Sequence, residues 1–335
     1  MSATTKSVDL VHPPPQISPQ LALQISQKAP QALKNAPSKP LPWPLSLVSS
    51  EDTEETWATY ENLYLSCLRT GDDKSARAIL DKLISRFGDQ NERVMAYQAM
   101  YAESRLESEM DQESLLKDLG YLLEADPTNM PIQKRRIALL TSMNRIPEAT
   151  EKLVDLLQVS PTDAEAWAEL ADLYLMQNSY DQAIFCLEEV LLIVPNAWNI
   201  HARLGEVIYL STSIAASTNP SEVARGLTEA MRRFCRSIEL CNNYLRGYYG
   251  LKLTSKKLLG VLPRASRSKD TTDSAYGDLP LPSEDTVKKL EALATEKLSE
   301  IVRKGSKSEK GWDGYEEAEL IAARELLDRD GDIQR

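Results

Sequence analysis

Apolar side chains recur at helical spacing between residues 161 and 197. Trp167, Leu170 and Tyr174 fall at i, i+3 and i+7, which places them on one face of a first helix. A second apolar stripe follows, and Pro195 ends it because proline cannot continue a helix interior. The pattern predicts a two-helix hairpin with small residues at the crossing, formed by Trp167, Leu170, Ala171, Tyr174, Ala183, Leu187, Val190 and Pro195.

The same spacing recurs along the chain. Counted from Ala164, the hairpin residues occupy positions 4, 7, 8, 11, 20, 24, 27 and 32 of a 34-residue unit, which is the tetratricopeptide repeat (TPR) pattern. Related units are expected at 57–90, at 91–129 in stretched form, at 130–163, from 198 with an insertion near 211–221, and from about 243, with Leu204, Gly205 and Gly250 in packing positions. One hairpin cannot bury its own stripe, so we expect an all-α TPR superhelical solenoid of about five to six helical hairpins.

Composition shifts divide the chain into four parts. Residues 1–50 hold nine of the 18 prolines and are expected to be a disordered or extended arm, with one short helix from Pro19 to Lys28 as an option. Residues 51–262 are the predicted solenoid. Residues 263–283 are expected to be a disordered loop, rich in Ser and Thr. Residues 284–330 are predicted to form two C-terminal capping helices, the second from Asp313 to near Leu327.

Charge and composition limit the classes of partner. The formal net charge of −11 disfavours nucleic acid, which needs a basic surface. No apolar run approaches the length of a membrane helix, and the N-terminal segment lacks the apolar core of a signal peptide. We therefore expect a cytosolic or nuclear chain whose four cysteines are buried thiols.

The sequence holds no recognisable catalytic arrangement. It has two histidines: His12 lies in the Pro-rich arm and His201 at a TPR packing position. No phosphate-binding, metal-binding or nucleophile motif occurs. We expect no enzymatic activity, no cofactor and no metal.

A TPR array can still bind a partner through its concave groove, which positions 2, 5, 9, 12 and 13 of each first helix line. The candidate partner-binding residues on these helices are Glu165, Asp172, Leu175, Met176, Asn199, Glu206, Tyr209 and Lys134. An ordinary solvated helix surface is the alternative for each. The groove is expected to be acidic to apolar, and Glu165 and Asp172 would repel a C-terminal carboxylate. That disfavours the clamp by which chaperone-binding TPR proteins hold their ligands.

Several segments resemble a particular family, subunit 2 of the endoplasmic reticulum (ER) membrane protein complex, of the kind found in fungi. The resemblance covers about residues 55–305. Its more specific parts are the sequence around Trp198-Asn199-Ile200-His201, the late second helix that follows, and Leu245-Arg246-Gly247-Tyr248-Tyr249-Gly250-Leu251; the run from Pro161 to Tyr174 is shared with TPR proteins generally.

The resemblance implies a non-catalytic scaffold on the cytoplasmic side of the ER membrane, held there through other subunits. It implies that the groove holds cytosolic segments of membrane subunits, especially subunit 5, with contacts to subunit 3, and so supports insertion of transmembrane helices. A generic soluble TPR adaptor or co-chaperone that binds a peptide segment is the alternative.

Overall fold

In the computed structural model, the described residues are 9–14, 17–35, 53–214, 219–265, 280–307, 312 and 314–332. Regular structure in this part of the chain is helical, from α1 to α15, which confirms the predicted all-α class. The chain divides into two compact units, Met1–Lys152 and Leu153–Arg335. The predicted hairpins are present in both, as successive helices joined by short turns.

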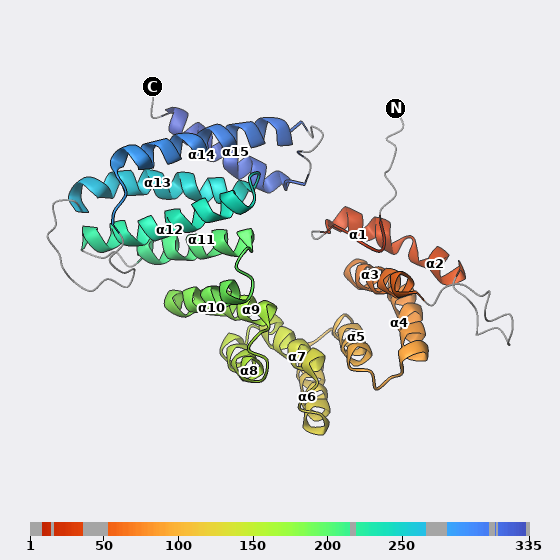
Figure 1. The fold of residues 1–335 in the computed structure, drawn as a ribbon. Coiled ribbons are helices and arrows are strands. Elements are labelled where there is room, and N and C mark those ends of the chain that lie inside the picture. Colours follow the sequence, from red (N-terminus) through yellow and green to blue (C-terminus); the bar gives the residue numbers. More distant parts are fainter. Residues whose placement is uncertain are drawn as a thin grey trace. The chain divides into compact units, whose positions relative to one another are not determined.

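The first unit is built from short helices joined in sequence (Figure 1). Its helices are α1 (Pro19–Ser26), α2 (Ala29–Asn35), α3 (Glu54–Thr70), α4 (Asp73–Phe87), α5 (Glu92–Glu103), α6 (Glu109–Ala125), α7 (Met130–Ser142) and the first part of α8 (Ile146–Val159). Gly71 ends α3 in the left-handed region, with φ 71°, where glycine carries no steric cost. The α3–α4 turn lies within the unit predicted at 57–90.

Residues 19–35 hold two helices, of which α1 matches the short helix that the sequence allows from Pro19 to Lys28, and α2 was not expected. Ser18 caps α1 by accepting a hydrogen bond from the Leu21 backbone N–H, and Pro19 occupies the first turn. α1 packs on α3, and Ile25 is fully buried in the same cluster as Tyr64. Asn62 Nδ2 also donates to the Leu10 carbonyl, at 2.9 Å. Apolar burial and these hydrogen bonds offset the local effect of the prolines.

The second unit contains the hairpin predicted at 161–197 and, after it, three pairs of longer packed helices. Its helices are the last part of α8, α9 (Ala164–Met176), α10 (Tyr180–Ile193), α11 (Trp198–Ile214), α12 (Pro220–Leu240), α13 (Leu245–Ala265), α14 (Glu284–Gly305) and α15 (Glu317–Asp332). Helices α11, α12, α13 and α14 lie side by side in that order (Figure 1). α14 thus completes a hairpin with α13, and α15 packs on both.

The 34-residue period is visible in the helix starts. α7, α9 and α11 begin at Met130, Ala164 and Trp198, so each start follows the last by 34 residues (164 − 130 and 198 − 164). The turns repeat too, because Asn144 and Asn178 both have φ 58° and stand 34 residues apart. Asparagine is among the residues that tolerate this conformation. α12 departs from this period, because it begins at Pro220, after the predicted insertion and 40 residues beyond the start of α10 at Tyr180 (220 − 180).

Two glycines bring α11 and α13 close to α12. A Cβ on Gly205 would lie 3.1 Å from the Ala230 carbonyl oxygen and from the Phe234 ring. A Cβ on Gly250 would lie 2.1 Å from the same ring, which is a severe overlap. Phe234 is 3% exposed, held between the two glycines. The glycines at position 8 therefore allow this aromatic side chain to fill the crossing.

The C-terminal part differs from the sequence expectation in its limits. α13 continues through Pro263 to Ala265, beyond the predicted end of the repeats at 262. α15 begins at Glu317 and includes Gly331, so it starts later and ends later than the predicted Asp313 to Leu327 helix. Most of the predicted 263–283 loop, from 266 to 279, lies outside the described residues. The proposed domain boundaries stay a prediction.

Candidate partner-binding face

The second unit presents the predicted groove residues on its first helices. Asp172 and Met176 are exposed on α9, and Glu206 is exposed on α11. Tyr209 and Leu175 are half-buried beside them, and Asn199 is exposed in the first turn of α11. We call the surface formed by Asp172, Met176, Arg203, Glu206, Tyr209 and Lys257 the first-helix face.

Arg203 joins the two acidic residues of this face. One terminal nitrogen of its guanidinium lies 3.0 Å from Asp172 Oδ1 and the other 2.8 Å from Glu206 Oε2. All three side chains are 40% or more exposed, so the bridges orient the groups more than they stabilise the fold. The face is consequently mixed in charge, whereas the sequence suggests acidic to apolar. Arg203 was missed because it stands at position 6, outside the groove positions considered.

Lys257 from α13 contributes a second cation. Its ammonium lies over the Tyr209 ring, 4.9 Å from the centroid, and donates to Ser213 Oγ. Burial lowers the pKa of Lys257 and raises that of the Tyr209 hydroxyl. The cation–π contact links Tyr209 on α11 to Lys257 on α13. Charged and aromatic groups from three first helices, α9, α11 and α13, thus meet on one face.

An arginine-to-carboxylate bridge between consecutive first helices is a repeated feature. In the first unit, Arg93 on α5 reaches Glu61 on α3 at 2.8 Å, and Arg135 on α7 bridges Glu103 on α5. In the second unit, Arg203 on α11 bridges Asp172 on α9. The sequence signal is an acid followed by an arginine 31 or 32 residues later. Each bridge joins two consecutive first helices through side chains of opposite charge.

Lys134 and Glu165 are two further predicted contact residues. Lys134 is half-buried on α7 in the first unit. Glu165 is exposed in the first turn of α9, where its negative charge interacts favourably with the positive end of the helix dipole. Within the second unit, the structure brings Asp172, Met176, Glu206 and Tyr209 onto the first-helix face.

Most of the predicted packing residues are buried within the second unit. Leu170, Ala171, Ala183, Leu187 and Leu204 are each 2% exposed or less, and Gly205 and Gly250 are buried. Pro195 is exposed, but its carbonyl oxygen lies 3.0 Å from His201 Nε2. Tyr174 and Trp167 are only half-buried, and the Trp167 indole donates to the Pro161 carbonyl at 2.8 Å. Trp167 thus contributes less buried surface than the repeat pattern suggests.

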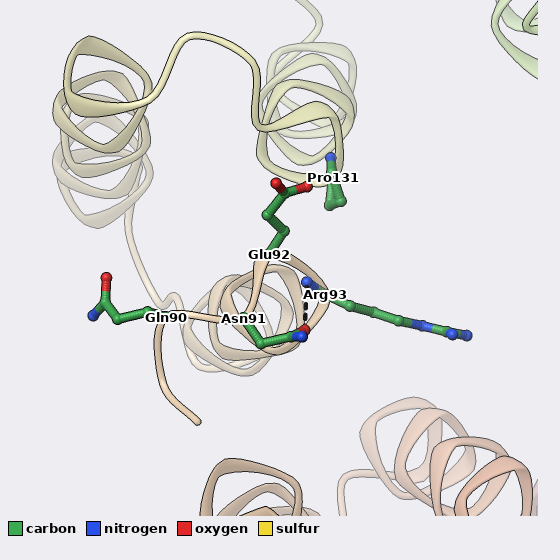
Figure 2. A pocket seen from close by; sticks show the side chains of 5 residues that line it. All are labelled: Gln90, Asn91, Glu92, Arg93 and Pro131. Carbon is green, nitrogen blue, oxygen red and sulfur yellow. Dashed lines mark hydrogen bonds between the residues drawn. The ribbon is translucent and has the colours of Figure 1, made fainter. Parts of the chain in front are cut away.

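The first unit has a hollow of about 460 Å³ near the starts of α5 and α7. Its lining residues are Gln90, Asn91, Glu92, Arg93 and Pro131. Figure 2 shows that the Arg93 side chain extends away from the others, toward its bridge with Glu61. Asn91 Oδ1 accepts from the Arg93 backbone N–H, which caps α5 (Figure 2). Asn91 therefore caps a helix and Arg93 pairs with Glu61, so these two polar side chains already have structural partners.

The described part of the chain contains no group of three or more His, Cys, Asp or Glu side chains placed to hold a metal ion. None of its helices is long and apolar enough to cross a membrane. Burial raises the pKa of the Cys67 and Cys186 thiols to about 12, so both stay protonated at neutral pH.

Comparison with known proteins matches residues 95–222 to the EMC2 TPR-like repeat domain. TPR repeat protein oca3 of Schizosaccharomyces pombe is 32% identical over 206 residues, which cover 62% of this chain and 68% of that protein. ER membrane protein complex subunit 2 of Xenopus tropicalis is 29% identical over 213 residues, 64% of this chain and 66% of that one. The subunit 2 of Saccharomyces cerevisiae is 26% identical over 205 residues, 59% and 68% respectively.

Among solved structures, the crystal structure of MamA is similar at 17% identity and a TM-score of 0.41, over 58% of this chain and 92% of that one. So distant a likeness says nothing of function. The repeated hairpins and the domain match define the chain as a helical-repeat protein of the TPR class. Given its similarity to oca3 and to the subunit 2 proteins, it belongs to the EMC2 family.

Proposed function

We propose that this protein is a scaffold subunit of an ER membrane protein complex, and that its first-helix face holds cytosolic segments of the membrane subunits. Relatives in the family are named as subunit 2 of that complex. Through this role the protein supports insertion of transmembrane helices into the ER membrane. It acts from the cytoplasmic side and is attached to the membrane through its partners.

The observation that carries the proposal is the meeting of α9, α11 and α13 at the first-helix face. Arg203 holds the two carboxylates of Asp172 and Glu206 in fixed positions. Met176 is 62% exposed and Leu210 37% exposed on the same helices. Fixed charges next to exposed apolar side chains suit a helical or extended segment that carries both basic and apolar residues.

The partners proposed for this face are cytosolic parts of subunits 5 and 3 of the complex. A partner lysine or arginine would compete with Arg203 for the two carboxylates, while its apolar side chains would cover Met176. Charge pairs of this kind chiefly govern partner choice and association rate. Catalysis is not part of the role: the scaffold holds membrane subunits in register.

Charge reversal on the face tests the proposal. Asp172→Lys combined with Glu206→Lys would place two lysines beside Arg203, and capture of membrane subunits should fall by roughly tenfold or more, as for the loss of a buried charge pair. The tagged protein would be purified from membranes solubilised in mild detergent, and the partners identified by mass spectrometry. Unchanged capture would move the binding surface elsewhere.

The matched control carries the same charge change on another helix. Glu325→Lys with Asp328→Lys replaces two exposed acids on α15. This control should retain the membrane subunits, and circular dichroism should show that both double variants keep their helicity. Equal losses in the two variants would point to a nonspecific effect of net charge.

A further inference from the structure

A second hollow, of about 300 Å³, opens between α8, α9 and α10 in the second unit. Its floor is apolar, because Leu157, Leu170 and Cys186 are each 5% exposed or less. Trp167 and Phe185 stand at its side as an edge-to-face pair with centroids 6.0 Å apart. We call it the α8–α10 pocket, and its residues are Val154, Leu157, Gln158, Trp167, Leu170, Tyr174, Gln182, Phe185 and Cys186.

The α8–α10 pocket lies on the opposite side of α9 from the first-helix face. Successive residues of a helix are turned by 100°, a consequence of 3.6 residues per turn. Trp167, Leu170 and Tyr174 share one stripe of α9 and line the pocket. Asp172 and Met176 fall on the other side and line the first-helix face. The pocket is therefore a separate surface and is not part of the proposed scaffold groove.

Exposure of a large aromatic side chain distinguishes this pocket from an ordinary packing defect. Phe185 is 55% exposed although it stands on the rim of an apolar cavity. Gln158 and Gln182 are exposed on the two flanking helices, α8 and α10. Carboxamide groups both donate and accept hydrogen bonds, as a peptide main chain does. An apolar floor with a few amide groups at the rim is the usual composition of a binding pocket.

The sign of the local charge selects the partner. Residues 153–200 include eight Asp and Glu side chains and no Lys, Arg or His. Arginines from α11 and α12 bridge two of these acids, Asp172 and Glu188. Asp181 and Glu189 stand on α10 next to pocket residues, and Glu189 is close enough to help raise the pKa of the Cys186 thiol, after burial. The stretch that forms the end of α8, α9 and α10 therefore carries a net negative charge, which favours a basic segment.

We propose that the α8–α10 pocket docks a basic peptide segment that places one bulky apolar side chain in the pocket, beside the Trp167–Phe185 pair. The inserted side chain covers the exposed aromatic surface, the two glutamines bond the segment's main chain, and its flanking lysines or arginines face the acids of α8 and α10. This gives the protein a second binding surface, beyond the one proposed for membrane subunits.

A defined peptide probe tests the proposal with the full chain. The probe is a fluorescein-labelled 12-residue peptide with two lysines on each side of one central phenylalanine and neutral polar residues elsewhere, followed by fluorescence anisotropy. We expect saturable binding that weakens as salt is raised. Replacing the central phenylalanine of the peptide by alanine should weaken binding by roughly tenfold, because the apolar contact is lost.

Phe185→Glu separates insertion from charge attraction. The added carboxylate would strengthen a purely electrostatic contact with the basic peptide, whereas it should weaken binding by roughly tenfold or more if the pocket receives the side chain. Leu192→Glu is the control, since it makes the same charge change on α10 at a residue that is 75% exposed and does not line the pocket. Leu192→Glu should not weaken binding.

Three results would overturn the proposal: no binding of the peptide, equal binding of its alanine form, or binding to Phe185→Glu as tight as to the unaltered protein. Met176→Glu on the first-helix face should leave peptide binding unchanged, so the two surfaces are tested independently. Thermal melts of each variant check that the fold is kept.

Discussion

The α9–α10 hairpin and the crossing of α11, α12 and α13 differ in how completely they bury their large aromatic side chains. The α9–α10 hairpin matches the repeat pattern at every position considered, yet its large aromatics, Trp167 and Phe185, stay partly exposed. At the other crossing, Phe234 is 3% exposed between Gly205 and Gly250. Agreement with a repeat pattern therefore does not measure how tightly a repeat is packed. The α9–α10 hairpin, which matches the pattern better, keeps exposed aromatic surface.

The largest expected effect is at the tight crossing. Phe234→Ala would leave a cavity against two glycines whose backbones cannot close it, so we expect a loss of about 3–5 kcal/mol in the free energy of unfolding. Chemical denaturation followed by circular dichroism measures this loss. A loss below about 1 kcal/mol would mean that the crossing is not closely packed.

Gly250→Ala tests the close packing of the same crossing by adding a Cβ atom. Its Cβ would overlap the Phe234 ring, and overpacking of this kind costs about 1–3 kcal/mol. Gly260→Ala in the same helix is the matched control, since no atom lies within 4 Å of its Cβ. The control should be stabilising by up to about 1 kcal/mol. The same sign for both substitutions would contradict the packing described.

Trp167→Ala should cost less than Phe234→Ala despite the larger side chain. Trp167 is half-buried beside an open pocket, so we expect a loss of about 1–2 kcal/mol. The same denaturation experiment measures it. A cost equal to that of Phe234→Ala would show that the pocket is closed in solution and that the two regions are packed alike.

The smallest expected effect is a pH dependence from His201. Burial lowers the pKa of this imidazole, against the opposing effect of its bond to the Pro195 carbonyl, and Arg233 and Arg236 lower it further. The folded state therefore binds the imidazole proton less readily than the unfolded state does. The stability that neutral His201 provides is fully present above about pH 6.5 and is lost as the pH falls through the folded pKa. His201→Gln should flatten the stability profile just below pH 6.5, measured as denaturation midpoints from pH 7 to 5.

The hairpins could be read from the sequence because their information is local. Helical periodicity and the 34-residue spacing predict the starts of α7, α9 and α11 closely. The Arg203 bridge depends on which two helices lie side by side, and the groove positions considered did not include it. The openness around Trp167 depends on how α8 and α10 are spaced, which residue identity does not encode. The helices in residues 19–35 form where packing on α3 outweighs the local effect of prolines.

Co-purification from solubilised membranes tests the central claim most directly. The account predicts that the unaltered protein brings down membrane subunits of an ER membrane protein complex, and that the Glu325→Lys, Asp328→Lys control does so equally. The Asp172→Lys, Glu206→Lys variant, with helicity intact, should lose them by roughly tenfold or more. Recovery of the protein alone or only with soluble chaperones, or equal capture by both double variants, would contradict a scaffold that binds through its first-helix face.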